Sequence, residues 1–392
     1  MRWDFIDPPT PEDLRQRQVS LEGIDRWWSA FESHCETIDQ YFTRGVAFDV
    51  SAFMDDHLKA ISPELMWEFG RAKEKEGHRL VITPETEREL RPLVRTLLQR
   101  APALSRWEFY GHRLPEPDMV EVMIEARVRR KVEEVKGRAL RGENHRIDVE
   151  FYLPSLSDVD ERSHAAFVAA ETLFGEELLD EWIGVVESTE ALGSAEWLGV
   201  EDLAREARAI LQTIRESLPD RPCHEVSEEA DWSMIELRPS EADDYPDQAD
   251  LFIAKTMVME MWRTAHDGSP FSSSRFSRLG ETFCYLKLDG KEGIEEEGFE
   301  DKSQIEDALD RSLAAEGLGC CIGGGTGWRY SYIDLALTDL PSAIQVIKRV
   351  LRAGRVPSRS WLLFFDDHWR DEWIGIWEDT PPPPRRSAPN GT

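Results

Sequence analysis

Apolar side chains recur at helical spacing early in the chain, after about 20 polar, Pro-rich residues that read as a lead-in. The first stripe consists of Ile24, Trp27, Phe31, Cys35, Ile38 and Phe42. This period of three to four residues predicts an amphipathic helix. A second helix is predicted over 49–61, because Asp49 is a favourable N-cap residue and Pro63 cannot continue a helix.

The pattern then changes to short apolar runs typical of strands. Residues 65–69 and 79–82 predict two strands joined by a charged turn. Thr83-Pro84 then opens a helix, since Thr is an N-cap residue type and Pro is tolerated in a first turn. A further strand, 107–110, follows the helix. The order is strand, turn, strand, helix, strand.

The middle of the chain is less regular. Residues 118–136 fit a helix or a strand, whereas 146–153 alternate as a strand does. A helix over 161–179 and a strand over 181–187 follow. Small residues and glycines then mark a boundary. We therefore predict an N-terminal domain over 1–190 and a linker over 191–200.

The second half predicts a C-terminal domain over 201–380 and a disordered, Pro-rich tail over 381–392. Ser303 and Glu306 have the spacing of a capping box at the start of a helix. The remaining predicted elements are helices over 203–218 and 340–351 and strands near 233–237 and 251–255 and over 282–288, 361–365 and 373–377. Between two further β-type runs, 319–322 and 329–337, the glycines of 323–327 predict a wide hairpin turn.

Both halves repeat strand, turn, strand, helix and a strand that begins with Trp, from Trp67 to Trp107 and from Cys320 to Trp361. Crossover helices of this kind cover one face of a sheet. The fold class predicted is α+β, with two ferredoxin-like α/β sandwich domains and additional N-terminal helices.

Charge narrows the classes of partner. The chain has 392 residues and a net charge of −30, and residues 1–200, with 40 acids and 25 bases, carry half of it. Such a protein is a poor general binder of nucleic acid or of anionic membranes. Five cysteines without framework spacing, and an N-terminus without the apolar core of a signal peptide, predict a cytoplasmic protein. No cofactor motif is present.

The sequence resembles uncharacterised two-domain bacterial proteins. The C-terminal residues behind this are Ser303 to Leu309, the glycine turn and Tyr330 to Asp334. The N-terminal residues are Trp28, Phe31, Ser62 to Leu65, Ala101-Pro102, Trp107 to Phe109, Leu173 to Glu176 and Ile183-Gly184. The resemblance implies a cytosolic protein whose C-terminal ferredoxin-like domain belongs to a family of unknown function. It implies no catalytic residue.

Two clusters in the C-terminal half are candidates for binding a ligand or partner. The residues are Gly323, Gly324, Gly325, Thr326, Gly327 and Arg329 at the glycine turn, and Asp366, Asp367 and His368 between two strands. No helix follows Gly327, so the turn is not a phosphate loop. The Asp-Asp-His run lacks defined metal-ligand spacing, so no metal site is predicted, and the catalytic residues stay unknown.

The one basic concentration, within 127–146, is interleaved with acids and reads as a solvated face or as a surface that pairs with acids. The favoured function is a non-catalytic cytosolic protein-interaction module that uses an acidic surface, with an immunity- or inhibitor-type protein as one form. The alternative is a small-molecule-binding protein or a hydrolase with its site at the glycine turn. Oligomeric state is left open.

Overall fold

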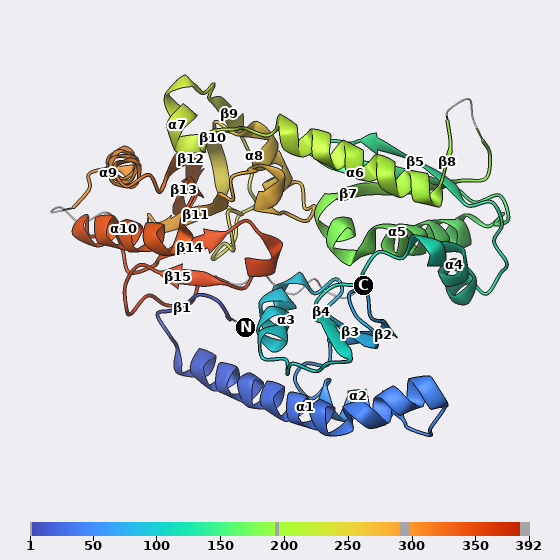
Figure 1. The fold of residues 1–392 in the computed structure, drawn as a ribbon. Helices are drawn as coiled ribbons and strands as arrows, with labels where there is room; N and C mark the ends of the chain where they lie inside the picture. The colour runs from blue at the N-terminus through green and yellow to red at the C-terminus, as the bar shows by residue number, and fades with distance from the viewer. Residues whose placement is uncertain (1, 193–195, 291–297, 385–392) are drawn as a thin grey trace. The chain divides into compact units, whose positions relative to one another are not determined.

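A computed structural model describes residues 2–192, 196–290 and 298–384. The chain forms two compact units (Figure 1). Unit 1 comprises Met1–Thr10 and Ser217–Thr392, and unit 2 comprises Pro11–Glu216. Both units combine helices with sheets, which confirms the predicted α+β class. Among the described residues, no helix is at once long and apolar enough to cross a membrane.

Unit 1 is built on an eight-stranded sheet with the order β1-β15-β14-β11-β13-β12-β10-β9. Its strands are β1 (Ile6–Asp7), β9 (Ser233–Glu236), β10 (Leu251–Thr256), β11 (Thr282–Asp289), β12 (Gly319–Gly327), β13 (Tyr330–Leu337), β14 (Ser360–Phe364) and β15 (Trp373–Gly375). Its longer helices are α8 (Met259–His266), α9 (Lys302–Ala315) and α10 (Leu340–Ala353), and α7 (Cys223–Val226) is a single turn. Short 3-10 turns lie at Ser227–Glu229, Ser273–Arg275 and Asp367–Trp369.

The two faces of this sheet differ because side chains alternate along each strand. In β13, Ile333, Leu335 and Leu337 pack into the apolar core that α9 and α10 share. The opposite face carries Tyr332 and the fully buried Asp334. Six consecutive elements, β11-α9-β12-β13-α10-β14, place their four strands in the order fourth, first, third, second, all antiparallel.

The glycine run 323–327 was expected in a turn, and the structure places it inside β12 instead. Gly323, Gly324 and Gly325 pair with β10 on one side and β13 on the other. A Cβ atom at Gly324 would collide with the Tyr332 carbonyl, and one at Gly325 with the Ile253 carbonyl. These glycines therefore allow the neighbouring backbones to approach closely, which is a packing role.

Unit 2 contains two smaller sheets. The strands β2 (Met66–Arg71), β3 (His78–Thr83) and β4 (Trp107–Tyr110) form one, and the other has the order β7-β6-β5-β8. The second sheet consists of β5 (Lys136–Arg141), β6 (Ile147–Tyr152), β7 (Ile183–Thr189) and β8 (Leu198–Gly199). In each sheet a hairpin is followed by a helix and a strand parallel to its second strand.

The helices of unit 2 are α1 (Pro11–Arg44), α2 (Val50–His57), α3 (Arg91–Gln99), α4 (Val120–Val128), α5 (Val159–Trp182) and α6 (Val200–Ser217), with 3-10 turns at Arg88–Leu90 and Pro117–Met119. The strand–helix order from Trp67 to Trp107 matches the sequence prediction. The pairing differs from that of unit 1, since β4 lies parallel beside β3, whereas β14 lies antiparallel beside β11.

The boundary between the two units does not lie within 191–200, where the small residues and glycines predicted a linker. Residues 193–195 lie outside the described part of the chain. The boundary lies at Glu216/Ser217, because Leu203, Ala207, Leu211 and Ile214 of α6 pack into the core of unit 2. The lead-in also differs, because residues 1–10 belong to unit 1. The predicted disorder of the tail concerns mostly 385–392, which lie outside the described residues.

The basic segment 127–146 pairs with acids of its own unit. Arg138 Nε donates to Glu150 at 2.6 Å, and Arg130 Nε lies 3.0 Å from Glu161 Oε2. Lys131 Nζ lies 2.7 Å from Glu133. These contacts fit the interleaved acids of the sequence and the reading of a solvated, charge-paired face.

Candidate ligand-binding site

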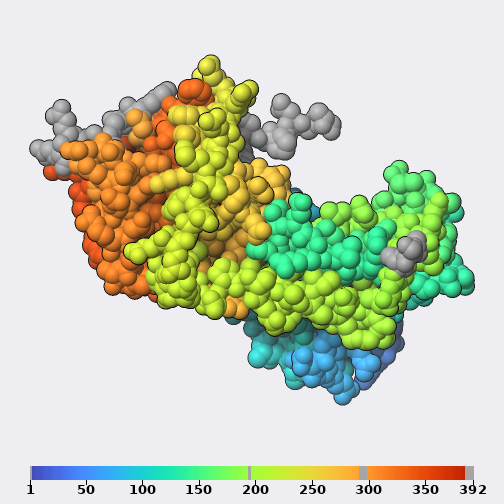
Figure 2. All heavy atoms as spheres, turned by 90° about the horizontal axis from the view of Figure 1, so that it is seen from above, coloured from blue at the N-terminus to red at the C-terminus, as the bar shows by residue number. Residues whose placement is uncertain are grey.

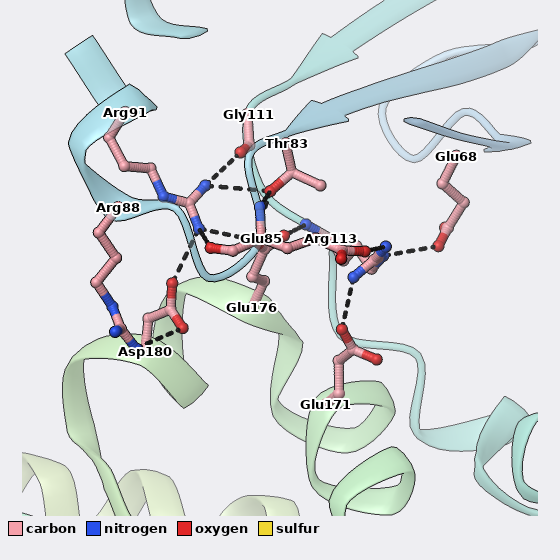
Figure 3. A network of polar contacts seen from close by, with 10 residues as sticks. All are labelled: Glu68, Thr83, Glu85, Arg88, Arg91, Gly111, Arg113, Glu171, Glu176 and Asp180. Atoms are coloured by element: carbon pink, nitrogen blue, oxygen red, sulfur yellow. Dashed lines mark hydrogen bonds and ion pairs between the residues drawn. The ribbon is translucent and has the colours of Figure 1, made fainter. Parts of the chain in front are cut away.

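A dense polar network in unit 2 holds the loop that follows β4 against α5 (Figure 3). Its centre is Glu176, which is 3% exposed and lies directly after a break in α5. Glu176 Oε2 accepts from the Arg113 backbone N–H at 3.0 Å, and the Glu176 N–H donates to the Arg113 carbonyl at 2.9 Å. This reciprocal pair fixes the loop to the helix.

Gly175 causes the break in α5. Its φ of +74° and ψ of 165° are not helical, and residues with a side chain rarely adopt such a positive φ. A Cβ atom there would lie 2.9 Å from both the Arg113 carbonyl oxygen and Pro115. Glycine at this position therefore lets the helix turn aside and the loop pack against it.

Arg91, from the first turn of α3, completes the centre. Its Nη2 lies 2.7 Å from Glu176 Oε1 and 2.9 Å from Asp180 Oδ2, and its Nη1 donates to the Gly111 carbonyl at 2.8 Å. The Thr83 hydroxyl also donates to Glu176. Burial acts to raise the pKa of Glu176, but Arg91 and the hydrogen bonds from Thr83 and Arg113 outweigh it and lower that pKa. Glu176 is thus held as a carboxylate.

The Arg113 side chain is equally well paired. Its guanidinium lies 2.6 Å from Glu171 and 3.5 Å from Glu68, and it donates to Glu85. Burial acts to lower its pKa, but Glu85, Glu171 and Glu176 raise the pKa above its ordinary value. Because every charge in the network has a partner within it, we assign the network a positioning role rather than a chemical one.

The network borders a cavity of about 420 Å³. The loop after β4, the break in α5 and one face of α6 form its walls. The lining residues are His112, Arg113, Leu114, Pro115, Phe174, Gly175, Glu177, Leu178, Arg208, Leu211, Gln212 and Arg215. A volume of this size lies within the range of small-molecule sites.

Two lining arginines belong to α6 and lie seven residues apart, which is two helical turns. Within the described part of the chain, Arg208 has no hydrogen bond or ion pair with another residue. Arg215 lies over the Trp182 ring at 5.0 Å and forms no ion pair there. Glu177 is the one acid among the lining residues. The cavity is therefore locally cationic in a protein of net charge −30.

His112 lines the same cavity and is half-buried. Among the described residues, no group exchanges a hydrogen bond with its ring nitrogens. Burial lowers its pKa, and Arg91 lowers it further, against the opposing charges of Glu176, Glu177 and Asp180. At neutral pH the ring is therefore uncharged, and it offers one donor and one acceptor to a ligand.

The residues that the sequence singled out lie in unit 1. Arg329 Nη2 lies 2.9 Å from Asp289 Oδ2. Asp366 is buried and accepts from the Ser273 N–H at 2.7 Å and the Ser273 hydroxyl at 2.5 Å. Asp367 and His368 lie in a 3-10 turn, where the His368 ring is 4.4 Å from that of Trp369.

The structure does not bring the two predicted clusters together. Tyr330, next to Arg329, pairs with Asp289 at one end of β11, whereas Phe364, just before Asp366, pairs with Cys284 near the other end. Five residues of strand separate these positions, about 17 Å at 3.4 Å per residue. Gly323 to Gly327 are strand residues, and Thr326 pairs with Ser331. In the described ranges, no three His, Cys, Asp or Glu residues are placed to hold a metal ion.

Comparisons with known proteins do not identify the chain. No protein-family model matches it, and neither the curated proteins nor the solved structures contain a match. The chemistry of the site is therefore what indicates a function.

Replacing Gly175 by Ala tests the positioning role of the break. The methyl group would meet the Arg113 carbonyl and Pro115 in a backbone conformation unfavourable for alanine. We expect the free energy of unfolding of unit 2 to fall by about 1–3 kcal/mol, measured by urea denaturation. Gly199→Ala is the control, because nothing lies within 4 Å of its added Cβ. Equal stability of the two variants would contradict this role.

Proposed function

We propose that unit 2 binds a small anionic molecule in the cavity beside the Arg91–Glu176–Arg113 network. The observation that carries the proposal is a cavity of about 420 Å³ with cationic and polar lining groups. Among the described residues, its two α6 arginines have no ion-pair partner and the ring nitrogens of His112 have no hydrogen-bond partner. A pocket with a few polar groups converging on apolar walls is the usual form of a ligand site.

The proposal agrees with the electrostatics of the molecule. A cationic cavity in an acidic protein is a local exception, so it selects for negative charge where the rest of the surface repels it. The neighbouring network supports it too, because paired carboxylates and guanidiniums fix the loop 111–116 through contacts within the protein. Such preorganisation reduces the entropy lost on binding.

Isothermal titration of the full chain with inorganic phosphate and with 4-phenylbutyrate tests the proposal. We expect at least one of these anions to bind, more weakly as salt is raised. Arg208→Ala and Arg215→Ala should each weaken binding about tenfold, which corresponds to about 1.4 kcal/mol. Arg205→Ala is the matched control, since Arg205 is exposed on α6 outside the cavity and pairs with Asp202.

Two outcomes would overturn the proposal. One is that neither anion binds the wild-type protein. The other is that the double variant Arg208→Ala/Arg215→Ala binds as tightly as the wild type, which would place the anion elsewhere.

The expected protein partner stays a prediction. Eleven of the 32 residues of 219–250 are Asp or Glu and two are Arg, and this segment (yellow-green in Figure 2) runs over the surface of unit 1. Its Met234 is 75% exposed and its Trp232 is 45% exposed. A partner with a basic surface would find complementary charge there.

For the domain type, the strand order and antiparallel pairing of β11-α9-β12-β13-α10-β14 support the ferredoxin-like proposal for unit 1. Unit 2, with two separate sheets that each contain a parallel pair, gives the proposal no such support.

A further inference from the structure

The ligand of this cavity can be defined more narrowly than as an anion. We infer that the site takes an organic acid with a single negative charge and an apolar body, in preference to an inorganic or doubly charged anion. This inference rests on the proposed function and concerns the same cavity.

The two positive charges on α6 are separated along the helix. The lining residues Arg208, Leu211, Gln212 and Arg215 share one helical face, so an apolar side chain and an amide stand between the two cations. The Cα atoms of the two arginines are about 10 Å apart along the axis. The Arg215 guanidinium lies over the Trp182 ring, 5.0 Å from the ring centroid. This face does not present several donors that converge on one point, as a phosphate site does.

One wall of the cavity is apolar. Leu114, Pro115 and Leu178 line it and are partly exposed, whereas the lining side chains of Phe174 and Leu211 are already buried, at 4% and 9% exposure. An inorganic anion would leave this surface in contact with water. Covering it removes apolar area from water, so an aromatic or alkyl body gains affinity that phosphate cannot.

Glu177 is an acidic residue that lines the cavity. It repels a second negative charge on the ligand, so a monoanion is favoured over a dianion. His112 adds selectivity of another kind. Its neutral ring has no hydrogen-bond partner in the described part of the chain, so it can donate to or accept from a carbonyl, hydroxyl or amine on the ligand body.

A pair of fluorescent probes separates charge from apolar contact. 1-Anilinonaphthalene-8-sulfonate carries one sulfonate on an aromatic body, and N-phenyl-1-naphthylamine is the same body without the charge. We expect the sulfonate probe to bind the wild type at least tenfold more tightly than the neutral probe. 4-Phenylbutyrate should displace it, and phosphate at equal concentration should not.

The variants give effects of opposite sign. Arg208→Ala and Arg215→Ala should each weaken the sulfonate probe about tenfold and leave the neutral probe unchanged. Leu178→Asn should weaken both probes. Glu177→Gln should tighten the sulfonate probe two- to threefold, because a like charge is removed. Circular dichroism of each variant checks that the fold is kept.

The results distinguish the inference from the function on which it rests. If phosphate binds at the α6 arginines as tightly as 4-phenylbutyrate, the organic-acid inference is wrong and anion binding stands. If Glu177→Gln weakens the sulfonate probe, or if both probes bind equally, the charge argument is wrong. If no anion binds the wild type, both proposals fail together.

Discussion

Replacing Glu372 by Ala should lower the free energy of unfolding of unit 1 by about 3 kcal/mol, more than any change in the cavity. Glu372 is 3% exposed, and its carboxylate accepts three consecutive backbone N–H groups of the N-terminal segment. The distances are 2.5 Å to Trp3 N, 2.9 Å to Asp4 N and 2.9 Å to Phe5 N. Removing the carboxylate leaves these donors without their acceptor.

The loss should spread to the rest of the N-terminal segment. Arg2 donates to the Trp373 carbonyl at 3.0 Å and lies over the Trp373 ring at 3.7 Å. Ile6 and Asp7 add a parallel strand to β15, and Lys348 Nζ lies 2.6 Å from Asp7. Since the carboxylate of Glu372 orders the backbone just before this strand, β1 should separate from the sheet when it is lost.

Hydrogen exchange of the amides of residues 3–7 measures this directly. We expect their protection to fall at least tenfold in Glu372→Ala and the global stability of unit 1 to fall in urea titrations. Glu378→Ala, an exposed acid in the same region, should change stability by less than about 0.5 kcal/mol. Unchanged protection in Glu372→Ala would show that the strand pairing alone holds the segment.

This segment also shows what a single sequence could not predict. Residues 1–10 belong to the first 20 residues, which as a whole are polar and Pro-rich and were predicted as a lead-in to the first helix, with no strand among them. Their order comes from a carboxylate about 370 residues away in the chain. Contacts of this separation leave no local signal, because local periodicity reports only which face of an element is buried.

The apolar stripes were more informative. Leu340, Ile344, Ile347 and Leu351 predict α10, and all four side chains are buried against the sheet of unit 1. The boundary at the start of α9 was less accurate. The N-cap is Asp301, whose side chain accepts from the Gln304 N–H, and not the Ser303–Glu306 pair. Asp301 and Ser303 are both N-cap residue types, so the sequence alone does not show which of them caps the helix.

The candidate site escaped prediction for a related reason. Arg91 and Glu176 are 85 residues apart and meet only in the folded chain. The one local signal was Gly175 within an otherwise helical pattern. The glycines of β12 led to a different error, since a strand was predicted as a turn. Glycine has no side chain, so a run of glycines shows no alternation of polar and apolar side chains.

A second large effect is expected at Asp334, which is 1% exposed on the sheet face opposite α9 and α10. Gln248 Nε2 lies 2.8 Å from Asp334 Oδ1, and Gln248 Oε1 lies 2.9 Å from His266 Nε2. The other ring nitrogen, Nδ1, lies 2.8 Å from the Trp262 carbonyl, which can only accept, so Nδ1 carries a hydrogen.

Donor and acceptor roles along this triad require one shared proton. If Asp334 is ionised, the amide of Gln248 donates to it and its oxygen faces His266 Nε2, which must then be protonated. If Asp334 is protonated, the amide turns round, accepts from the carboxyl and donates to a neutral His266. Burial lowers the pKa of His266 and raises the pKa of Asp334 to about 7, so the uncharged arrangement is favoured below that pH.

The pH dependence follows from the direction of the Asp334 shift. Its folded pKa is about 7 and an unfolded Asp has a pKa near ~3.9, so its contribution to stability is complete below about pH 4 and is lost as pH rises through 7. This difference of about three between the folded and unfolded pKa of Asp334 corresponds to about 4 kcal/mol. The charged groups nearby are Lys302, which lowers this pKa, and Glu306, which raises it. Asp267 acts on His266 and raises the pKa of that ring.

Asp334→Asn should therefore stabilise unit 1 at pH 8 by about 4 kcal/mol, with the difference falling towards zero by pH 4. The asparagine amide donates to Gln248 as the protonated carboxyl does, and it has no charge to lose. Urea denaturation of both proteins between pH 4 and 9 measures the difference. Asp243→Asn, at an exposed position, should follow the wild-type profile throughout. Parallel profiles for Asp334→Asn and wild type would mean that Asp334 stays ionised and that the shared proton resides on His266.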